Sequence, residues 1–146
     1  MTAIVQLSSA CLALVLLTSA VGLRLLYVRT AEMREKRIHP QAASTSLQMA
    51  AKLQNVQAAD NFRNLFETPV LFYALVAVAL ATAHTPSWLV LGTWLYVITR
   101  SVHSFIHCTY NTVLHRFAVF GIGFSLLIGL WVAFVFTLAA QPVLVR

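Results

Sequence analysis

Charged residues are scarce in this chain. Of its 146 residues, 10 are Lys or Arg and 4 are Asp or Glu, while 60% are hydrophobic and the mean hydropathy is +0.80. So apolar a composition excludes a soluble globular domain and is typical of an integral membrane protein. The net charge of +6 does not require a nucleic-acid partner, because basic residues that flank membrane spans and contact anionic lipid head groups account for it.

Cysteine is also scarce. The two cysteines, Cys11 and Cys108, lie in the first and third predicted spans, at opposite depths of the membrane. A disulfide needs Cα atoms within about 7 Å of each other, so a bridge between them is excluded. We interpret both as small apolar side chains that contribute to packing.

Four stretches without charged residues are candidates to cross the hydrocarbon. A crossing takes about 20 residues in helical form. Their apolar cores lie at about residues 3–23, 68–83, 86–99 and 117–140, within helices at about 3–27, 47–84, 86–109 and 113–140. The predicted fold class is all-α, an integral membrane four-helix bundle that forms one domain over residues 1–146. No charged residue precedes Arg24, whereas a signal peptide begins with a basic segment, so we expect the first span to be retained.

Lys and Arg are missing before the first span and from the short connection at residues 84–86. They gather in the connection after the first span, as Arg24, Arg29, Arg34, Lys36, Arg37 and Lys52, and at the edges of the connection after the third, as Arg100 and Arg116. The positive-inside rule then makes both basic connections cytoplasmic and places both termini on the opposite side. The one sizeable loop is at about residues 31–46.

Glycine and proline are missing between Pro40 and Pro69. This absence favours one continuous helix over about residues 47–84, which Pro69 should bend where it enters the bilayer. In the fourth span, Gly121, Ser125 and Gly129 recur at intervals of four residues. This face of small residues predicts close helix packing within or between subunits. Four short helices bury little surface, so we also expect an oligomer.

The charged side chains of the spans cluster at one depth. A set of eight polar side chains lies between residues 57 and 116: Asp60, Arg63, Asn64, Glu67, Arg100, His103, His107 and Arg116. Spacings of three and four residues place its members on one face of the second span and on one face of the third. Because Glu67 and Arg100 have the same expected depth on neighbouring antiparallel helices, we expect them to meet. Arg116 should approach the same pocket from the fourth span.

Two interpretations of this polar set remain open. Ionisable groups at membrane depth are costly unless they are paired or face a polar cavity, so the set is either an ion-pair network that fixes helix register or a polar-ligand site. Eight groups on three helices exceed what register needs, and Arg with Asn suits an anionic ligand bearing carboxylates or phosphates. A further alternative is that His103 and His107, four residues apart, bind a metal ion or haem, with Asp60 or His115 as a third ligand.

The polar set resembles a known pattern. The run from Asp60 to Glu67, Asp-Asn-Phe-Arg-Asn-Leu-Phe-Glu, resembles the Arg-Ala-His-x-Asn-x-x-Glu motif of the MAPEG family, the membrane-associated proteins in eicosanoid and glutathione metabolism. Residues 100–103, Arg-Ser-Val-His, resemble the family's Arg-x-x-His/Tyr. Arg116 falls where the prostaglandin E synthase branch has an arginine. The resemblance covers nearly the whole chain.

The resemblance implies a homotrimer that binds glutathione between subunits and acts as a transferase or peroxidase on lipophilic substrates. Membrane lipids and a lipophilic small molecule are the partners it implies. The cofactor-binding residues, carried over by position, are Arg63, Asn64, Glu67, Arg100, His103 and His107. Arg116 is the expected catalytic residue, because a fixed cation stabilises the thiolate. The resemblance implies no metal site.

Three positions depart from the family pattern. Asp60 replaces the leading arginine of the motif, His107 stands where tyrosine is common, and Phe117 follows Arg116 where some catalytic members have a hydroxyl residue. The reversed charge at Asp60 motivates an alternative function, a non-catalytic membrane subunit or lipid-binding scaffold that keeps the fold. Metal or haem binding by His103 and His107 is the third hypothesis.

Overall fold

The computed structural model describes residues 1–140, which contain helices and no strand. The elements in order are α1 (Ala3–Glu35), the 3-10 helix η1 (Pro40–Ala43), α2 (Ser46–Lys52), α3 (Gln57–Asn64), α4 (Thr68–Ala81), α5 (Ser87–Cys108) and α6 (Val113–Ala139). Four segments are long and apolar enough to cross a membrane: Ala3–Glu35, Gln57–Ala81, Ser87–Cys108 and Val113–Ala139. The predicted all-α membrane protein with four spans is confirmed.

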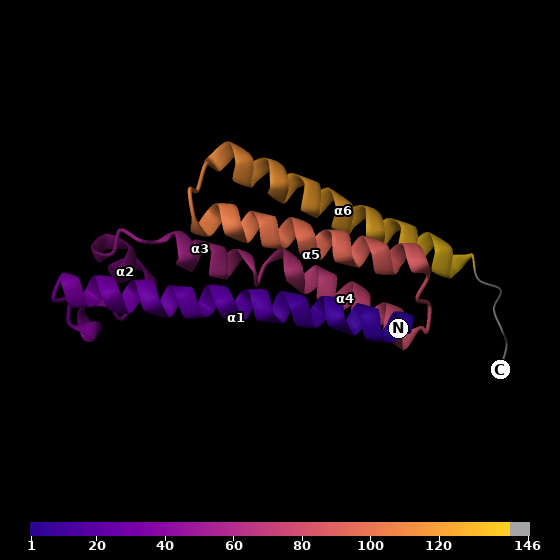
Figure 1. Cartoon of the computed structure of the whole chain (residues 1–146), viewed down its shortest axis with the longest axis horizontal. Coiled ribbons are helices and arrows are strands. Elements are labelled where there is room, and N and C mark those ends of the chain that lie inside the picture. Colours follow the sequence, from indigo (N-terminus) through magenta and orange to yellow (C-terminus); the bar gives the residue numbers. More distant parts are fainter. Residues whose placement is uncertain (141–146) are drawn as a thin grey trace.

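The helix α5 lies at the centre of the arrangement, between α1 and α6 (Figure 1). It also contacts α3, while α4 packs on α1 and α6. Apolar side chains from every span fill the core, among them Leu14, Phe72, Leu89 and Phe134, all fully buried. The rings of Phe72 on α4 and Tyr96 on α5 stack with centroids 5.0 Å apart. Because lipid is as apolar as these side chains, their close van der Waals packing, rather than removal from water, holds the helices together.

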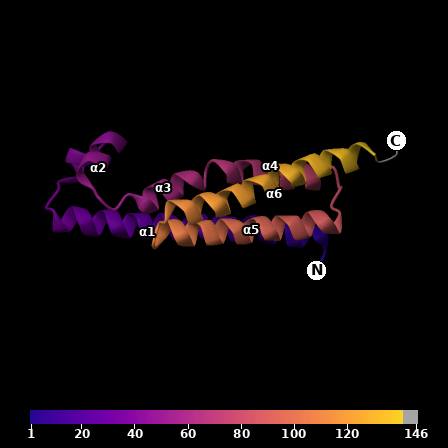
Figure 2. The same cartoon turned by 90° about the horizontal axis from the view of Figure 1, so that it is seen from above.

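The helix α1 extends past the other spans at the end where η1 and α2 lie (Figures 1 and 2). Its 33 residues make a rod of about 50 Å, whereas the hydrocarbon is about 30 Å thick. Near this projecting end, Glu32 is buried and its carboxylate accepts hydrogen bonds from the backbone N–H groups of Gln54 (2.7 Å) and Asn55 (3.1 Å). Lys36 forms an ion pair with the same carboxylate at 2.7 Å. These contacts bind the segment before α3 to α1.

The prediction of one helix over residues 47–84 is wrong, because the chain forms α2, α3 and α4 there. The first break lies after Lys52, where Leu53 is extended and the next two N–H groups bond to Glu32 rather than to helix carbonyls. The second break covers residues 65–67, one turn before Pro69. A proline ring collides with the carbonyl four residues earlier, here that of Leu65, and proline lacks an N–H. The expected bend at Pro69 is therefore a complete interruption.

The small-residue face of α6 points away from the other helices of the subunit. A Cβ added at Gly121 or Gly129 would meet no atom within 4 Å, and Ser125 is exposed. The close approach of α6 to α5 uses Gly123 instead, where an added Cβ would lie 2.7 Å from Thr99 Oγ1. Packing through the predicted face therefore involves groups outside this subunit.

Candidate functional site

A pocket of about 140 Å³ lies where α3, α5 and α6 meet. Three of the predicted site residues line it, Asn64 from α3, His103 from α5 and Arg116 from α6. Its remaining walls are the apolar side chains of Val113, Phe117 and Phe120. The pocket thus combines a cation, an amide and an imidazole with an apolar surface.

Arg116 is held by contacts to both its side chain and its backbone. Its Nη1 lies 2.9 Å from His107 Nε2 and donates to Asn111 Oδ1, also at 2.9 Å. Its carbonyl oxygen is 3.2 Å from His103 Nδ1. Asn111, in the turn between α5 and α6, was not predicted as a site residue, because nothing in its sequence spacing connects it to the polar set. The guanidinium is therefore fixed at the edge of the pocket.

Arg100 is 1% exposed and lies behind one wall of the pocket. Its guanidinium carbon is 4.9 Å from the ring centroid of Phe120, which lines the pocket, and 5.4 Å from that of Tyr96. Arg100 donates through Nε to the hydroxyl of Tyr96 and through Nη2 to that of Thr68. Within residues 1–140, the ion pairs are Lys36 with Glu32 and Arg63 with Asp60, so no carboxylate lies within 4.0 Å of Arg100. A buried cation without an anion is strongly unfavourable.

The expected meeting of Glu67 and Arg100 does not occur. Glu67 is exposed and occupies the position before α4, in the interruption at residues 65–67. Its neighbour Thr68 is the residue that contacts Arg100. The expectation assumed one continuous helix, in which the helical periodicity would place Glu67 on the face towards α5. Because the helix is interrupted at residues 65–67, Glu67 does not lie on that face.

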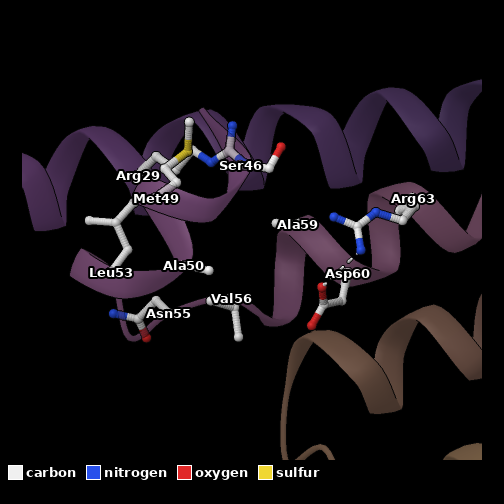
Figure 3. Close-up of a pocket in the computed structure, with 10 residues that line it drawn as sticks. All are labelled: Arg29, Ser46, Met49, Ala50, Leu53, Asn55, Val56, Ala59, Asp60 and Arg63. Carbon is white, nitrogen blue, oxygen red and sulfur yellow. Dashed lines mark ion pairs between the residues drawn. The ribbon is translucent and has the colours of Figure 1, made fainter. Parts of the chain in front are cut away.

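Arg63 and Asp60 belong to a second, smaller pocket of about 70 Å³ between α1, α2 and α3. Figure 3 shows the guanidinium of Arg63 directed towards the carboxylate of Asp60, and the two form an ion pair at 4.0 Å. Arg29 of α1 and Met49 of α2 line the same pocket. The polar set is thus divided between two pockets, with Asn64, His103 and Arg116 at one and Asp60 and Arg63 at the other.

Asn61 is the most deeply buried polar residue of α3, with 0% exposure, and it was not predicted as a site residue. Its Nδ2 lies 3.3 Å from Cys108 Sγ, and its Oδ1 accepts a hydrogen bond from the Ser104 hydroxyl at 3.3 Å. These bonds hold α3 against α5 beside the site. The sequence did carry a signal, since an amide inside an otherwise apolar contact must find partners.

The two histidines of α5 are buried next to each other, with ring centroids 5.6 Å apart. Within residues 1–140, His103 Nε2 and His107 Nδ1 have no hydrogen-bond partner, while the other nitrogen of each ring contacts Arg116. Among the residues the structure describes, no group of three or more His, Cys, Asp or Glu side chains is placed to hold a metal ion. The third ligand that the metal hypothesis requires is therefore not brought to this pair.

Comparison with known proteins agrees with the motif resemblance. The sequence model of the MAPEG family matches residues 7–136, which is most of the chain. Searches of curated proteins and of solved structures found no match.

Proposed function

Because the chain belongs to the MAPEG family, we propose that it is a glutathione-dependent transferase or peroxidase that acts on lipophilic substrates. The observation that carries this proposal is the positive charge at the α3–α5–α6 pocket. Arg116 lines it, Arg100 lies behind Phe120, and within residues 1–140 neither guanidinium has a carboxylate within 4.0 Å. An anionic ligand that bound here would supply the missing negative charge.

The proposed chemistry depends on Arg116. A thiol is a weak nucleophile, and a fixed cation close to its sulfur favours the thiolate. The thiolate sulfur forms a bond to the electrophilic carbon of the substrate, and the displaced electron pair leaves with the departing group. With a hydroperoxide, the thiolate sulfur attacks the terminal peroxide oxygen, the O–O bond breaks, and the alkoxide takes up a proton and leaves as the alcohol. A second glutathione then reduces the resulting sulfenic acid, which gives glutathione disulfide and water. Asn64 and His103 line the same pocket and are proposed to bind the peptide part of glutathione.

The other predicted cofactor-binding residues have different positions. Arg100 and His107 are buried beside the pocket, where they act on the ligand through charge and through Arg116. Arg63 and Glu67 are exposed outside this pocket. Their proposed contacts with glutathione therefore need a neighbouring subunit, as in the homotrimer that we propose for this chain. We also propose that the pocket faces the cytoplasm, because basic residues gather at this end of the bundle.

A lipophilic substrate has a direct approach from the bilayer. Val113, Leu114 and Phe117, at the start of α6, are each more than 60% exposed, and Val113 and Phe117 line the pocket. Apolar side chains that are exposed to lipid next to a cationic pocket suit a substrate with a hydrophobic body and a polar reacting group.

The test measures glutathione binding and turnover separately in Arg116→Ala. Thermal unfolding of the detergent-solubilised protein detects binding, because a ligand at about 100 times its Kd stabilises by about 2.7 kcal/mol. Turnover is assayed with an aryl halide and with an organic hydroperoxide. We expect the variant to keep a glutathione-induced shift that is smaller than that of the wild type, and to lose turnover by about a hundredfold or more. Arg34→Ala, on the exposed end of α1, is the control and should keep both.

Two results would contradict the proposal. Unchanged turnover in Arg116→Ala removes the assigned role of that residue. No thermal shift of the wild-type protein with glutathione rejects glutathione as the ligand.

A non-catalytic, lipid-binding function is the second candidate, and one observation favours it. A groove of about 240 Å³ lies between α1 and α5, lined by Leu17, Val21 and Phe105 with Arg24 among them. Such a groove suits an acyl chain with an anionic head group at the arginine. This function predicts lipid that stays bound through purification, and no thiol chemistry. Transferase activity of a lipid-free preparation would rule it out.

A further inference from the structure

The contact between Arg116 and His107 determines which nitrogen of the imidazole carries the proton. Arg116 Nη1 lies 2.9 Å from His107 Nε2. A guanidinium nitrogen can only donate, so Nε2 must be the acceptor. The neutral ring then carries its proton on Nδ1. The doubly protonated imidazolium cannot make this contact, because it would set an N–H against an N–H.

The two acceptors on Nη1 fix the orientation of the guanidinium. His107 is 1% exposed and cannot follow a moving partner. Asn111 Oδ1 accepts from the same Nη1 at 2.9 Å, and His103 Nδ1 donates to the carbonyl of Arg116 at 3.2 Å. Arg116 is thus held by its backbone and by one nitrogen of its side chain. The remaining guanidinium N–H groups are available for a ligand in the pocket.

We propose that His107 is a positioning residue for Arg116 and that it performs this role only while its imidazole is neutral. The inference rests on the proposed function of Arg116. Protonation of Nε2 replaces an acceptor with a donor and places a second positive charge against the guanidinium. Arg116 then keeps only Asn111 as a side-chain partner, and the fixed cation beside the thiolate is lost. Activity therefore falls as the pH decreases through the titration of His107.

The groups around His107 come from four helices. Arg116 of α6 and Asp60 of α3 are the charged side chains that act on it, with opposite signs. His103 lies on the same helix, in ring contact. From α1, Arg24 donates to the carbonyl of Cys108, the residue after His107, at 2.6 Å.

Two substitutions of His107 separate its role as a hydrogen-bond acceptor from its change of charge with pH. His107→Gln offers an amide oxygen close to the position of Nε2 and has no titratable proton. His107→Leu offers no acceptor. Because a hydrogen bond to a charged group is worth about ten- to a hundredfold in an equilibrium constant, we expect kcat of the Leu variant to fall by about tenfold or more, with little change in KM for glutathione. The glutathione thiolate is also protonated at low pH, so wild-type kcat should fall through two titrations. We expect the Gln variant to keep most of kcat and to fall through one titration, that of the thiol.

Asn111→Gly is the matched control. It removes the second acceptor, and glycine tolerates the positive φ of 49° at this position. This variant should have a lower kcat and an unchanged acid limb, because His107 still titrates. An acid limb in His107→Gln with the same two titrations as in the wild type, or a normal kcat in His107→Leu, would overturn the proposal. If the Leu variant does not fold, the pH profile of the Gln variant still decides.

A spectroscopic measurement tests the contact without any turnover. The protein is labelled with ¹⁵N-histidine and studied by NMR in lipid nanodiscs. The signals of His107 are identified as those that are absent from His107→Gln. We expect them to show a proton on Nδ1 and none on Nε2. A proton on Nε2 at neutral pH would reject the positioning contact. The expected tautomer together with no thiol turnover would leave the contact in place and reject the proposed function instead.

Discussion

Within residues 1–140, three residues other than glycine have positive φ, and each lies in a connection that follows a helix. They are Arg37 (51°), Ala83 (53°) and Asn111 (49°). Asparagine adopts this left-handed conformation readily, whereas alanine pays about 1–2 kcal/mol for the approach of its Cβ to the next carbonyl oxygen. Ala83 is therefore the position in the connection between α4 and α5 where glycine is better suited.

We expect Ala83→Gly to raise the free energy of unfolding by about 0.5–1 kcal/mol, because glycine removes the Cβ clash at positive φ. Denaturation of the detergent-solubilised protein measures the change. Ala77→Gly, at an exposed position inside α4, is the control and should destabilise by about the same amount. A loss of stability in both variants would contradict the argument.

At this scale, the sequence predicted part of the arrangement of the polar side chains. Residue types and spacing placed Asn64, His103 and Arg116 close together, and these three line one pocket. Asn111 and Thr68 were missed, because a turn in one case and a helix interruption in the other decide which side chains reach the arginines. Both depend on backbone geometry that helical periodicity does not contain.

At the scale of elements, the contact between α5 and α6 depends on one small residue. A Cβ at position 123 would lie 2.7 Å from Thr99 Oγ1 and 3.3 Å from Thr99 Cβ. The hydroxyl cannot move freely, because it donates to the carbonyl of Tyr96 at 2.8 Å. The two helices carry His103, His107 and Arg116, so their separation also sets the geometry of the pocket.

We expect Gly123→Ala to lower the free energy of unfolding by about 1–3 kcal/mol through overpacking against Thr99. Thermal unfolding measures the loss. Gly121→Ala is the matched control on the same helix, since its Cβ would meet no atom within 4 Å. Equal free energies of unfolding for the two variants would show that Thr99 can move aside without loss of stability.

Helix boundaries were the least predictable part of the fold. Composition was enough for four spans, because the apolar runs have the length that a bilayer demands. Composition was not enough to predict that residues 46–81 form three helices. One break depends on the carboxylate of Glu32, which is 22 residues from Gln54 in the sequence. A contact between distant positions leaves no trace in local helix propensity.

At the scale of the whole molecule, α6 has a strip of small residues that no other helix of the subunit covers. Gly121, Ser125 and Gly129 lie on it, and large apolar side chains such as Ile122, Ile128 and Val132 are exposed on the same helix. Small residues allow helices of different subunits to approach closely in a membrane. In the proposed homotrimer, this strip is a contact surface for a second copy of the chain.

We expect Gly129→Leu to reduce the trimer fraction in detergent, as measured by native mass spectrometry, because a branched side chain prevents close approach. The fold of the subunit should survive, since a Cβ at position 129 has no neighbour within 4 Å. Gly129→Ala, a smaller change at the same position, should retain more trimer. A trimer fraction that is unchanged in Gly129→Leu would place lipid on this strip instead.

The bonds from Gln54 and Asn55 to Glu32 also bear on the order in which the protein is made. They join residues 22 and 23 positions apart, so they can form as soon as residue 55 has left the ribosome and before α5 has emerged from it. Closing so short a loop costs little entropy, and domains assemble from the N-terminus during translation. The point at which the second span enters the bilayer can thus be set early, so that the arginines of the later spans arrive at a partner helix already in place.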